Sequence, residues 1–296
     1  MQFDLFKDGP DVGLRNAVVA ALYARNPDAL RETIDRLRSN FPNDSLLGGF
    51  EHLYAECRAL NRTDWSATDI ARQLERFETQ LLPVLKKVIG TDAAQRWIAP
   101  VYSDLARAAD GQAFTRCAAN AHAASLFLRA GEFTAARAAI EGIPSWRRIP
   151  EPLTWMAEIT LRQNLPDEYW PLTAELAWIA PALLPPLFAQ AAPATVLRLY
   201  REFCAEAEAP DDEGDAGAWF PAWLLVEHPD LLPFLRTAHP HNSRPARSAA
   251  LLIDLLIGER QGLTQTVLGK RRQLRELAPA IFERYIAQRS DTSTLT

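Results

Sequence analysis

The sequence lacks any long uninterrupted apolar run. Its most apolar stretch, residues 176–197, is broken by the four prolines Pro181, Pro185, Pro186 and Pro193, and proline interrupts the helix that is needed to cross a membrane. The first residues, MQFDLFKDGPDVG, carry acidic side chains where a secretory signal needs basic ones, and no apolar segment follows them directly. We therefore expect a cytoplasmic protein that does not span a membrane.

Cysteine is scarce, which argues against a disulfide framework or a cysteine-bound metal. The three cysteines, Cys57, Cys117 and Cys204, lie far apart and without the C-x-x-C spacing of such sites. We expect them to be reduced and to pack as small apolar side chains. No metal or other cofactor is predicted.

Histidine offers one exception to consider, in the loop that contains His239 and His241. These two imidazoles, with His228 upstream, would supply part of a metal site, but no cysteine or clustered carboxylate lies nearby in the sequence to complete it. The alternative, which we favour, is a polar loop in which Asn242 or Ser243 caps the helix that follows.

The chain also lacks an excess of positive charge. It has 32 Lys and Arg against 37 Asp and Glu, a formal net charge of −5. Proteins that bind nucleic acids generally present a basic face, so we expect no nucleic-acid partner. Nearly all the basic residues are arginines, which reflects either codon use or selection for bidentate contacts with carboxylates and phosphates.

Signature motifs of the common enzyme classes are absent. The chain contains no G-x-S-x-G, H-E-x-x-H, G-x-x-x-x-G-K-[ST] or G-x-G-x-x-G, so no catalytic or cofactor-binding residue is predicted. An enzyme on this chain would have to bring together carboxylates from different helices. Glu158, Asp167, Glu168 and Glu175 are the candidates.

What the sequence does contain is helical periodicity, shown most clearly by residues 126–144, LFLRAGEFTAARAAIEGIP. Apolar side chains recur at helical spacing up to Gly131, a residue that can end a helix in the left-handed conformation. A second apolar stripe runs from Phe133 to Ile140, and Pro144 closes the unit. The pattern predicts a helical hairpin.

Similar patterns of helix, break, helix and proline occur at residues 18–42, 184–210 and 251–279. The unit near 123–144 resembles a tetratricopeptide repeat, and the other three share its outline without the constant spacing of about 34 residues that this family shows. The residues that carry the resemblance are Leu126 or Leu128, Gly131, Phe133, Ala138 and Pro144. The resemblance implies an array of antiparallel helix pairs, an α-solenoid or right-handed superhelix, with a groove that binds a partner.

We therefore predict an all-α fold, an antiparallel helix-hairpin array of roughly 13–16 helices without a sheet. Residues 1–209 form the predicted array, and residues 218–289 form a C-terminal helical region packed on it, with a soft boundary near residue 210. The acidic segment 205–217 is predicted to be an exposed loop, and residues 290–296 a flexible tail.

Two groups of residues are candidates for binding a partner. In the first, Trp146, Arg147 and Arg148 lie in a proline-bounded loop before Trp155, where they would hold an acidic peptide or a phosphate group. The alternative is that the arginines pair with local carboxylates such as Glu151.

The second group is the stripe of Trp219 and Trp223, which are four residues apart and therefore share a helix face. Tryptophan is frequent at interaction hot spots, so the stripe is a candidate anchor for a partner. The alternative, which we favour, is that it belongs to the core and closes one end of the array.

These features predict a non-catalytic protein–protein interaction or adaptor protein that binds a protein or peptide partner in a helical groove. The alternative is a small-ligand receptor or an enzyme on an α/α helical scaffold, with a Trp-lined pocket in which carboxylates converge.

Overall fold

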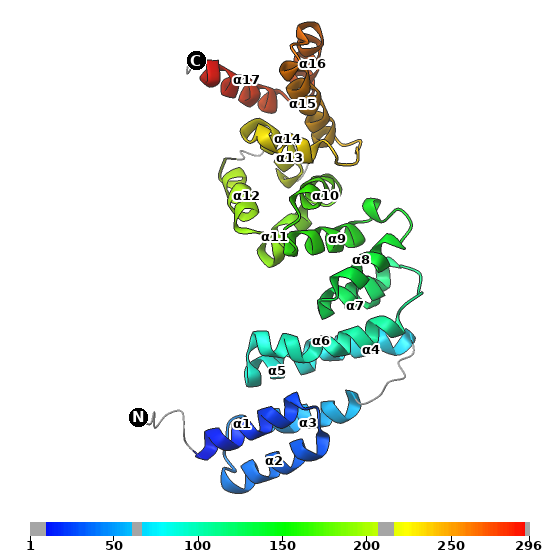
Figure 1. Ribbon diagram of the computed structural model, residues 1–296, viewed down its shortest axis with the longest axis vertical. Helices are drawn as coiled ribbons and strands as arrows, with labels where there is room; N and C mark the ends of the chain where they lie inside the picture. Colours follow the sequence, from blue (N-terminus) through cyan, green and yellow to red (C-terminus); the bar gives the residue numbers. More distant parts are fainter. Residues whose placement is uncertain (1–9, 61–66, 207–215, 294–296) are drawn as a thin grey trace, which may run out of the picture. The chain divides into compact units, whose positions relative to one another are not determined.

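The structure is a computed structural model that describes residues 10–60, 67–206 and 216–293 (Figure 1). Within these ranges the chain forms helices and turns and no β-strand, so the predicted all-α class is confirmed. The chain divides into two compact units, residues 1–139 and residues 140–296. None of the helices in the described ranges is both long and apolar enough to cross a membrane.

The first unit is built from neighbouring helices that pack on one another. Helix α1 packs on α2, α2 on α3, α5 on α6 and α6 on α7, and α3 also contacts α5. A π-helical turn, Phe77–Leu81, joins α4 to α5, and a 3₁₀ turn, Arg116–Ala121, precedes α7. The helices are α1 (Pro10–Tyr23), α2 (Pro27–Asn40), α3 (Leu47–Leu60), α4 (Ala67–Arg76), α5 (Leu82–Ile89), α6 (Thr91–Ala108), α7 (Ala123–Ala130) and α8 (Phe133–Glu141), which reaches the boundary.

The hairpin of α1 and α2 forms where the sequence predicts it. The side-chain oxygen of Asn26 accepts hydrogen bonds from the backbone N–H groups of Asp28 and Ala29, both at 3.1 Å, and Pro27 is the first residue of α2. These bonds satisfy donors that have no partner inside the helix. The apolar stripe of α2 (Leu30, Ile34 and Leu37) is buried.

Two helices, α7 and α8, also form at residues 126–144, with the predicted break at Gly131. Gly131 has φ +79° and ψ 12°, the left-handed conformation, and the N–H of Glu132 donates to the carbonyl of Phe127 at 2.9 Å. This is the closing bond of a Schellman motif, which supplies carbonyls at the helix end with a donor. A side chain at position 131 would therefore strain the backbone even though the space around it is open.

Gly131→Ala is expected to destabilise the protein by about 1 kcal/mol, because alanine is disfavoured at positive φ. Gly48→Ala is the matched control, since its added methyl also meets open space but Gly48 lies in helix α3. The control is expected to be neutral or stabilising by about 0.5 kcal/mol. Urea unfolding followed by circular dichroism measures both, and equal effects of the two substitutions would contradict the backbone argument.

The second unit is arranged around one apolar helix, α13. Every residue from Phe220 to Val226 is buried, and α13 packs against α10, α12, α15 and α17. Short 3₁₀ turns precede α9, α11, α13 and α14. The helices are α9 (Pro150–Arg162), α10 (Pro166–Ile179), α11 (Leu184–Ala191), α12 (Ala194–Glu206), α13 (Phe220–Glu227), α14 (Leu232–Leu235), α15 (Arg244–Arg260), α16 (Thr264–Leu277) and α17 (Pro279–Ser293).

The units differ from the domains that the sequence suggests. They meet between Ala139 and Ile140, whereas the sequence places a soft boundary near residue 210. The core of the predicted acidic loop, residues 207–215, lies outside the described residues. Helix α17 extends to Ser293, inside the predicted tail 290–296, of which the last three residues are also outside the described ranges.

The three cysteines are free thiols in different environments. Cys57 is buried, whereas Cys117 and Cys204 are exposed, so packing as a small apolar side chain is confirmed only for Cys57. Burial raises the pKa of the Cys57 thiol to about 11, although the nearby Arg25 partly opposes the shift.

Cys57 is therefore expected to be the least reactive thiol. With a pKa of about 11, it is ionised in roughly one molecule in a thousand at a pH of about 8, and only the thiolate attacks disulfide reagents. A double variant, Cys117→Ser with Cys204→Ser, should lose the fast phase of labelling by 5,5′-dithiobis(2-nitrobenzoate). A fast phase that persists in the native double variant would show that Cys57 is accessible.

Candidate functional site

All six candidate binding residues lie in the second unit, and the structure separates them into two places. Trp146, Arg147 and Arg148 form a 3₁₀ turn before α9, and Trp155 lies half-buried on α9 itself. Trp219 ends the turn before α13, and Trp223 lies within α13. A third place, the groove between α15 and α16, was not among the predicted sites.

The turn at residues 146–148 is tied to the interior by an ion pair. The guanidinium carbon of Arg147 lies 5.3 Å from the ring centroid of Trp146, and its Nε lies 3.6 Å from Oε2 of Glu175. Glu175 is on α10, and its side chain is only 2% exposed. The other carboxylate oxygen, Oε1, accepts the backbone N–H of His239 at 2.8 Å. Glu175 therefore connects two loops that are far apart in the sequence.

The arginine partner differs from the one considered in the sequence. Glu151 was the suggested local carboxylate, whereas Arg147 pairs with Glu175 across the unit. Arg148 is exposed. Burial lowers the pKa of His239, and the charges of Arg147 and Arg148 lower it further. The contact that His239 makes with Glu175 is through its backbone N–H, not through its imidazole ring. Across the described residues, His, Cys, Asp and Glu side chains form no group of three that would hold a metal ion.

Burial raises the pKa of the Glu175 carboxyl, and the His239 N–H and Arg147 only partly oppose it. At 3.6 Å, the Arg147 Nε and the Glu175 Oε2 are too far apart for a good hydrogen bond, and neither atom has another hydrogen-bond partner in the described structure. A loose pair of this kind recovers little of the cost of burying its charges.

The stability of the protein relative to a Glu175→Gln variant should consequently fall as the pH rises above about 4.5. A raised folded-state pKa means that the folded chain binds this proton more tightly than the unfolded chain. That stabilisation is complete below the unfolded pKa and is lost as the pH rises through the folded one. Urea midpoints across the pH range measure the difference.

Glu141→Gln, which removes an exposed carboxylate, is the control for the loss of one negative charge. The urea midpoint of Glu175→Gln relative to wild type should change with pH. The midpoint of Glu141→Gln relative to wild type should change less. A difference that stays constant or increases with pH would contradict the raised pKa.

Trp219 and Trp223 are buried, with 5% and 4% of their surface exposed, as the core interpretation of the stripe expects. They also form one wall of a cavity of about 510 Å³ between α12, α13 and α17. The indole N–H of Trp223 donates to Oε2 of Glu206 at 3.1 Å, and Arg284 donates to the same oxygen at 2.5 Å. The residues that line this Trp-walled cavity are Phe203, Ala205, Glu206, Ala216, Trp219, Trp223, Ala280, Ile281, Glu283 and Arg284.

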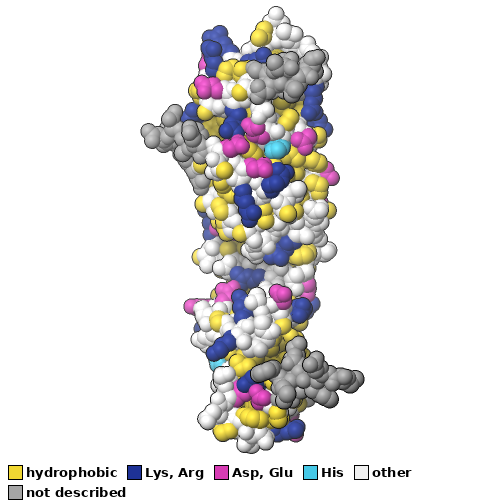
Figure 2. Space-filling view, turned by 90° about the vertical axis from the view of Figure 1, so that its left-hand side faces the viewer, with side chains coloured by type: hydrophobic (Ala, Val, Ile, Leu, Met, Phe, Trp, Pro, Cys, Tyr) yellow, Lys and Arg dark blue, Asp and Glu magenta, His cyan; other side chains and the backbone are white. Residues whose placement is uncertain are grey.

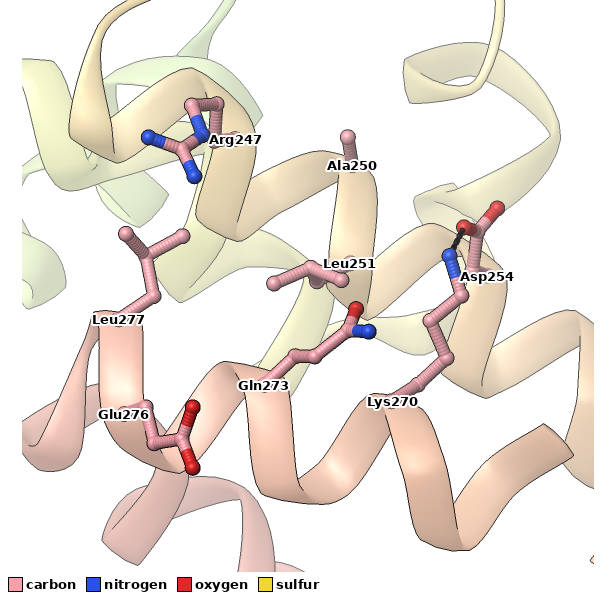
Figure 3. Close-up of a pocket in the computed structure, with 8 residues that line it drawn as sticks. All are labelled: Arg247, Ala250, Leu251, Asp254, Lys270, Gln273, Glu276 and Leu277. Carbon is pink, nitrogen blue, oxygen red and sulfur yellow. Dashed lines mark hydrogen bonds and ion pairs between the residues drawn. The ribbon is translucent and has the colours of Figure 1, made fainter. Parts of the chain in front are cut away.

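Figure 3 shows the groove between α15 and α16, which has a volume of about 460 Å³. Leu251 and Gln273 lie at its centre, and Lys270 bridges to Asp254 at one end with an N–O distance of 2.5 Å. At the opposite end Arg247 and Leu277 approach one another (Figure 3). The remaining lining residues are Ala250 and Glu276.

The two helices approach one another closely near their connecting turn. A Cβ on Gly258 would lie 3.1 Å from Cγ2 of Val267, so the absent side chain allows this approach. The buried residues Leu252, Leu255, Leu256 and Leu274 hold the hairpin in the core. The groove lies farther from the turn and is lined by other residues of both helices, and the ion pair between Lys270 and Asp254 joins α15 to α16 at one end of it.

The remaining carboxylate candidates do not converge on either cavity. Glu158 accepts hydrogen bonds from Arg162 at 2.8 Å and from Gln190 at 3.1 Å. Asp167 and Glu168 lie in the first turn of α10. Neither the groove nor the Trp-walled cavity is lined by any of these residues or by Glu175.

On the face that Figure 2 shows, acidic and basic side chains alternate, and the apolar side chains between them are scattered. A surface of this kind carries no broad field of one sign. We therefore look for binding sites in the concave parts of the surface, the groove and the Trp-walled cavity, and not in its overall charge.

Comparison with known proteins identifies no family. No protein-family model, curated protein sequence or solved structure matches the chain. The tetratricopeptide resemblance accordingly stays a prediction.

Proposed function

We propose that this chain is a protein-interaction module, with the role of an adaptor, that binds a segment of a partner protein in the groove between α15 and α16. The observation that supports the proposal is the composition of the groove: Leu251 and the amide of Gln273 lie at its centre, and charged residues lie along both sides (Figure 3). Grooves between helices commonly bind a partner segment through apolar anchors, and charged residues along the rim fix its orientation.

The charges define which partner segment would fit. Lys270 is paired with Asp254, and Glu276 with Arg272 at 3.0 Å, so these charges are compensated within the chain. Arg247 is exposed, and its side chain has no hydrogen-bond or ion-pair partner within the described ranges. A segment with an apolar side chain over Leu251 and a carboxylate beside Arg247 would complement the groove.

Arg247→Glu is expected to weaken the binding of such a segment at least about tenfold, because it replaces attraction with repulsion at the end of the groove. The partner is selected first, by displaying a random peptide library against the wild-type protein. Enriched peptides should carry an acidic residue near an apolar one, and their affinities are then measured by fluorescence anisotropy.

Arg275→Glu is the matched control. It makes the same charge change on α16, at an exposed residue that does not line the groove. If no peptide is enriched, or if the enriched peptides bind the Arg247→Glu variant as well as they bind the control, the groove is not the interaction site.

A further inference from the structure

We infer that the Trp-walled cavity between α12, α13 and α17 is a binding site for an organic cation with an apolar stem. The cation is an alkylammonium or a guanidinium, either in a small molecule or as a lysine or arginine side chain of another protein. The inference goes beyond the proposed function, because the cavity shares no residue with the groove between α15 and α16.

The shape and the walls suit a small organic group. A volume of about 510 Å³ falls within the range of small-molecule sites. Phe203, Trp219, Trp223 and Ile281 supply aromatic and aliphatic surface for an apolar stem. These side chains are held by the core, since Trp223 contacts the rings of Phe203 and Phe220 with centroid distances of 5.8 and 6.2 Å. The wall is therefore preformed.

The sign of the ligand follows from the charges at the cavity. Arg284 is already committed, because its Nη1 donates to Glu206 at 2.5 Å and to Glu227 at 3.0 Å. The hydrogen bond from Arg284 is the main reason that the pKa of the Glu206 carboxyl is lowered, so Glu206 is ionised at neutral pH. Glu283 also lines the cavity and is exposed, and its carboxylate has no ion-pair or hydrogen-bond partner among the residues described.

The helix dipoles at the cavity do not change the expected positive charge of the ligand. Ala205 and Glu206 are at the C-terminal end of α12, which favours a cation, whereas Ala280 and Ile281 are at the N-terminal end of α17, which favours an anion. The two contributions oppose one another, so the uncompensated carboxylate of Glu283 decides.

The aromatic wall reinforces the preference for a cation. Indole rings attract cations to their faces. One face of Trp219 already holds a cation, since the guanidinium carbon of Arg244 lies 5.8 Å from its ring centroid, so Trp223 is the indole available to a ligand. Arg244 is itself anchored, because its Nε donates to the carbonyl of Leu277 at 2.8 Å. An apolar stem on the indoles with its cationic head near Glu283 uses both features of the cavity.

Three probes of one shape test the sign of the ligand: 4-phenylbutylamine, 4-phenylbutanol and 4-phenylbutyrate. Isothermal titration calorimetry with the full chain should give saturable binding of the amine. The alcohol should bind at least about fivefold more weakly, and the carboxylate more weakly still. Equal affinities for the amine and the alcohol, or no saturable binding of the amine, would overturn the proposal.

Variants locate the site. Glu283→Gln should weaken the amine about fivefold, whereas Asp230→Asn, an equal charge change at an exposed residue outside the cavity, should leave its affinity unchanged. Ala280→Trp places a large side chain at an exposed position of the cavity wall and should abolish binding while the circular dichroism spectrum stays that of wild type. Unchanged affinity in either cavity variant would place the amine elsewhere and overturn the proposal.

A further titration separates the two sources of the cation. The pentapeptide acetyl-Ala-Ala-Lys-Ala-Ala-amide presents the ammonium as a side chain, and the same peptide with norleucine replacing lysine is its control. Binding of the lysine peptide as tightly as the amine, with loss in the control, assigns the cavity to a basic side chain of a partner. Binding of the free amine alone assigns it to a small molecule. Either result supports a cation site.

Discussion

The enclosure of helix α13 is the constraint on which the second unit depends. A helix whose buried residues run without interruption from Phe220 to Val226 cannot lie on a surface, because any exposed side would leave large apolar side chains in water. The unit meets this requirement by packing α10, α12, α15 and α17 around it. Of these helices, α10 and α17 lie well away from α13 in the sequence, whereas in a repeat array each hairpin would contact only its neighbours.

The two cavities arise from that arrangement in different ways. The Trp-walled cavity lies where α12 and α17 reach α13, so its wall is made of core aromatic residues and its rim of the helix ends that surround them. The groove lies on the hairpin of α15 and α16, whose inner side packs in the core. Residues that the core does not need are therefore left on the outer side of that hairpin.

The sequence predicts local structure well in this chain because the signals are local. Asn26 with Pro27 and Gly131 act within a few residues of themselves, and each ends or begins a helix as expected. The core role of Trp219 and Trp223 also follows from their spacing, and the structure buries both.

Contacts between side chains that are far apart in the sequence could not be predicted from the sequence. The partner of Arg147 is Glu175 rather than the nearby Glu151, and nothing in the composition of either segment marks the two residues as neighbours. Glu283 and Arg247 read as ordinary surface charges in the sequence. They become distinctive only because the fold places each beside a concave apolar surface.

Because of that placement, an unpaired exposed charge can determine which ligands bind beside it. On an open surface such a charge stays hydrated and costs the fold almost nothing. A ligand that covers the apolar wall next to it must also remove part of its water, which is unfavourable unless the ligand brings the opposite charge. If the two proposals hold, Arg247 beside Leu277 and Glu283 beside Ile281 select ligands of opposite sign. The proposed specificities of the two cavities would then differ through one charge each, and their apolar surface would add affinity without discriminating between charges.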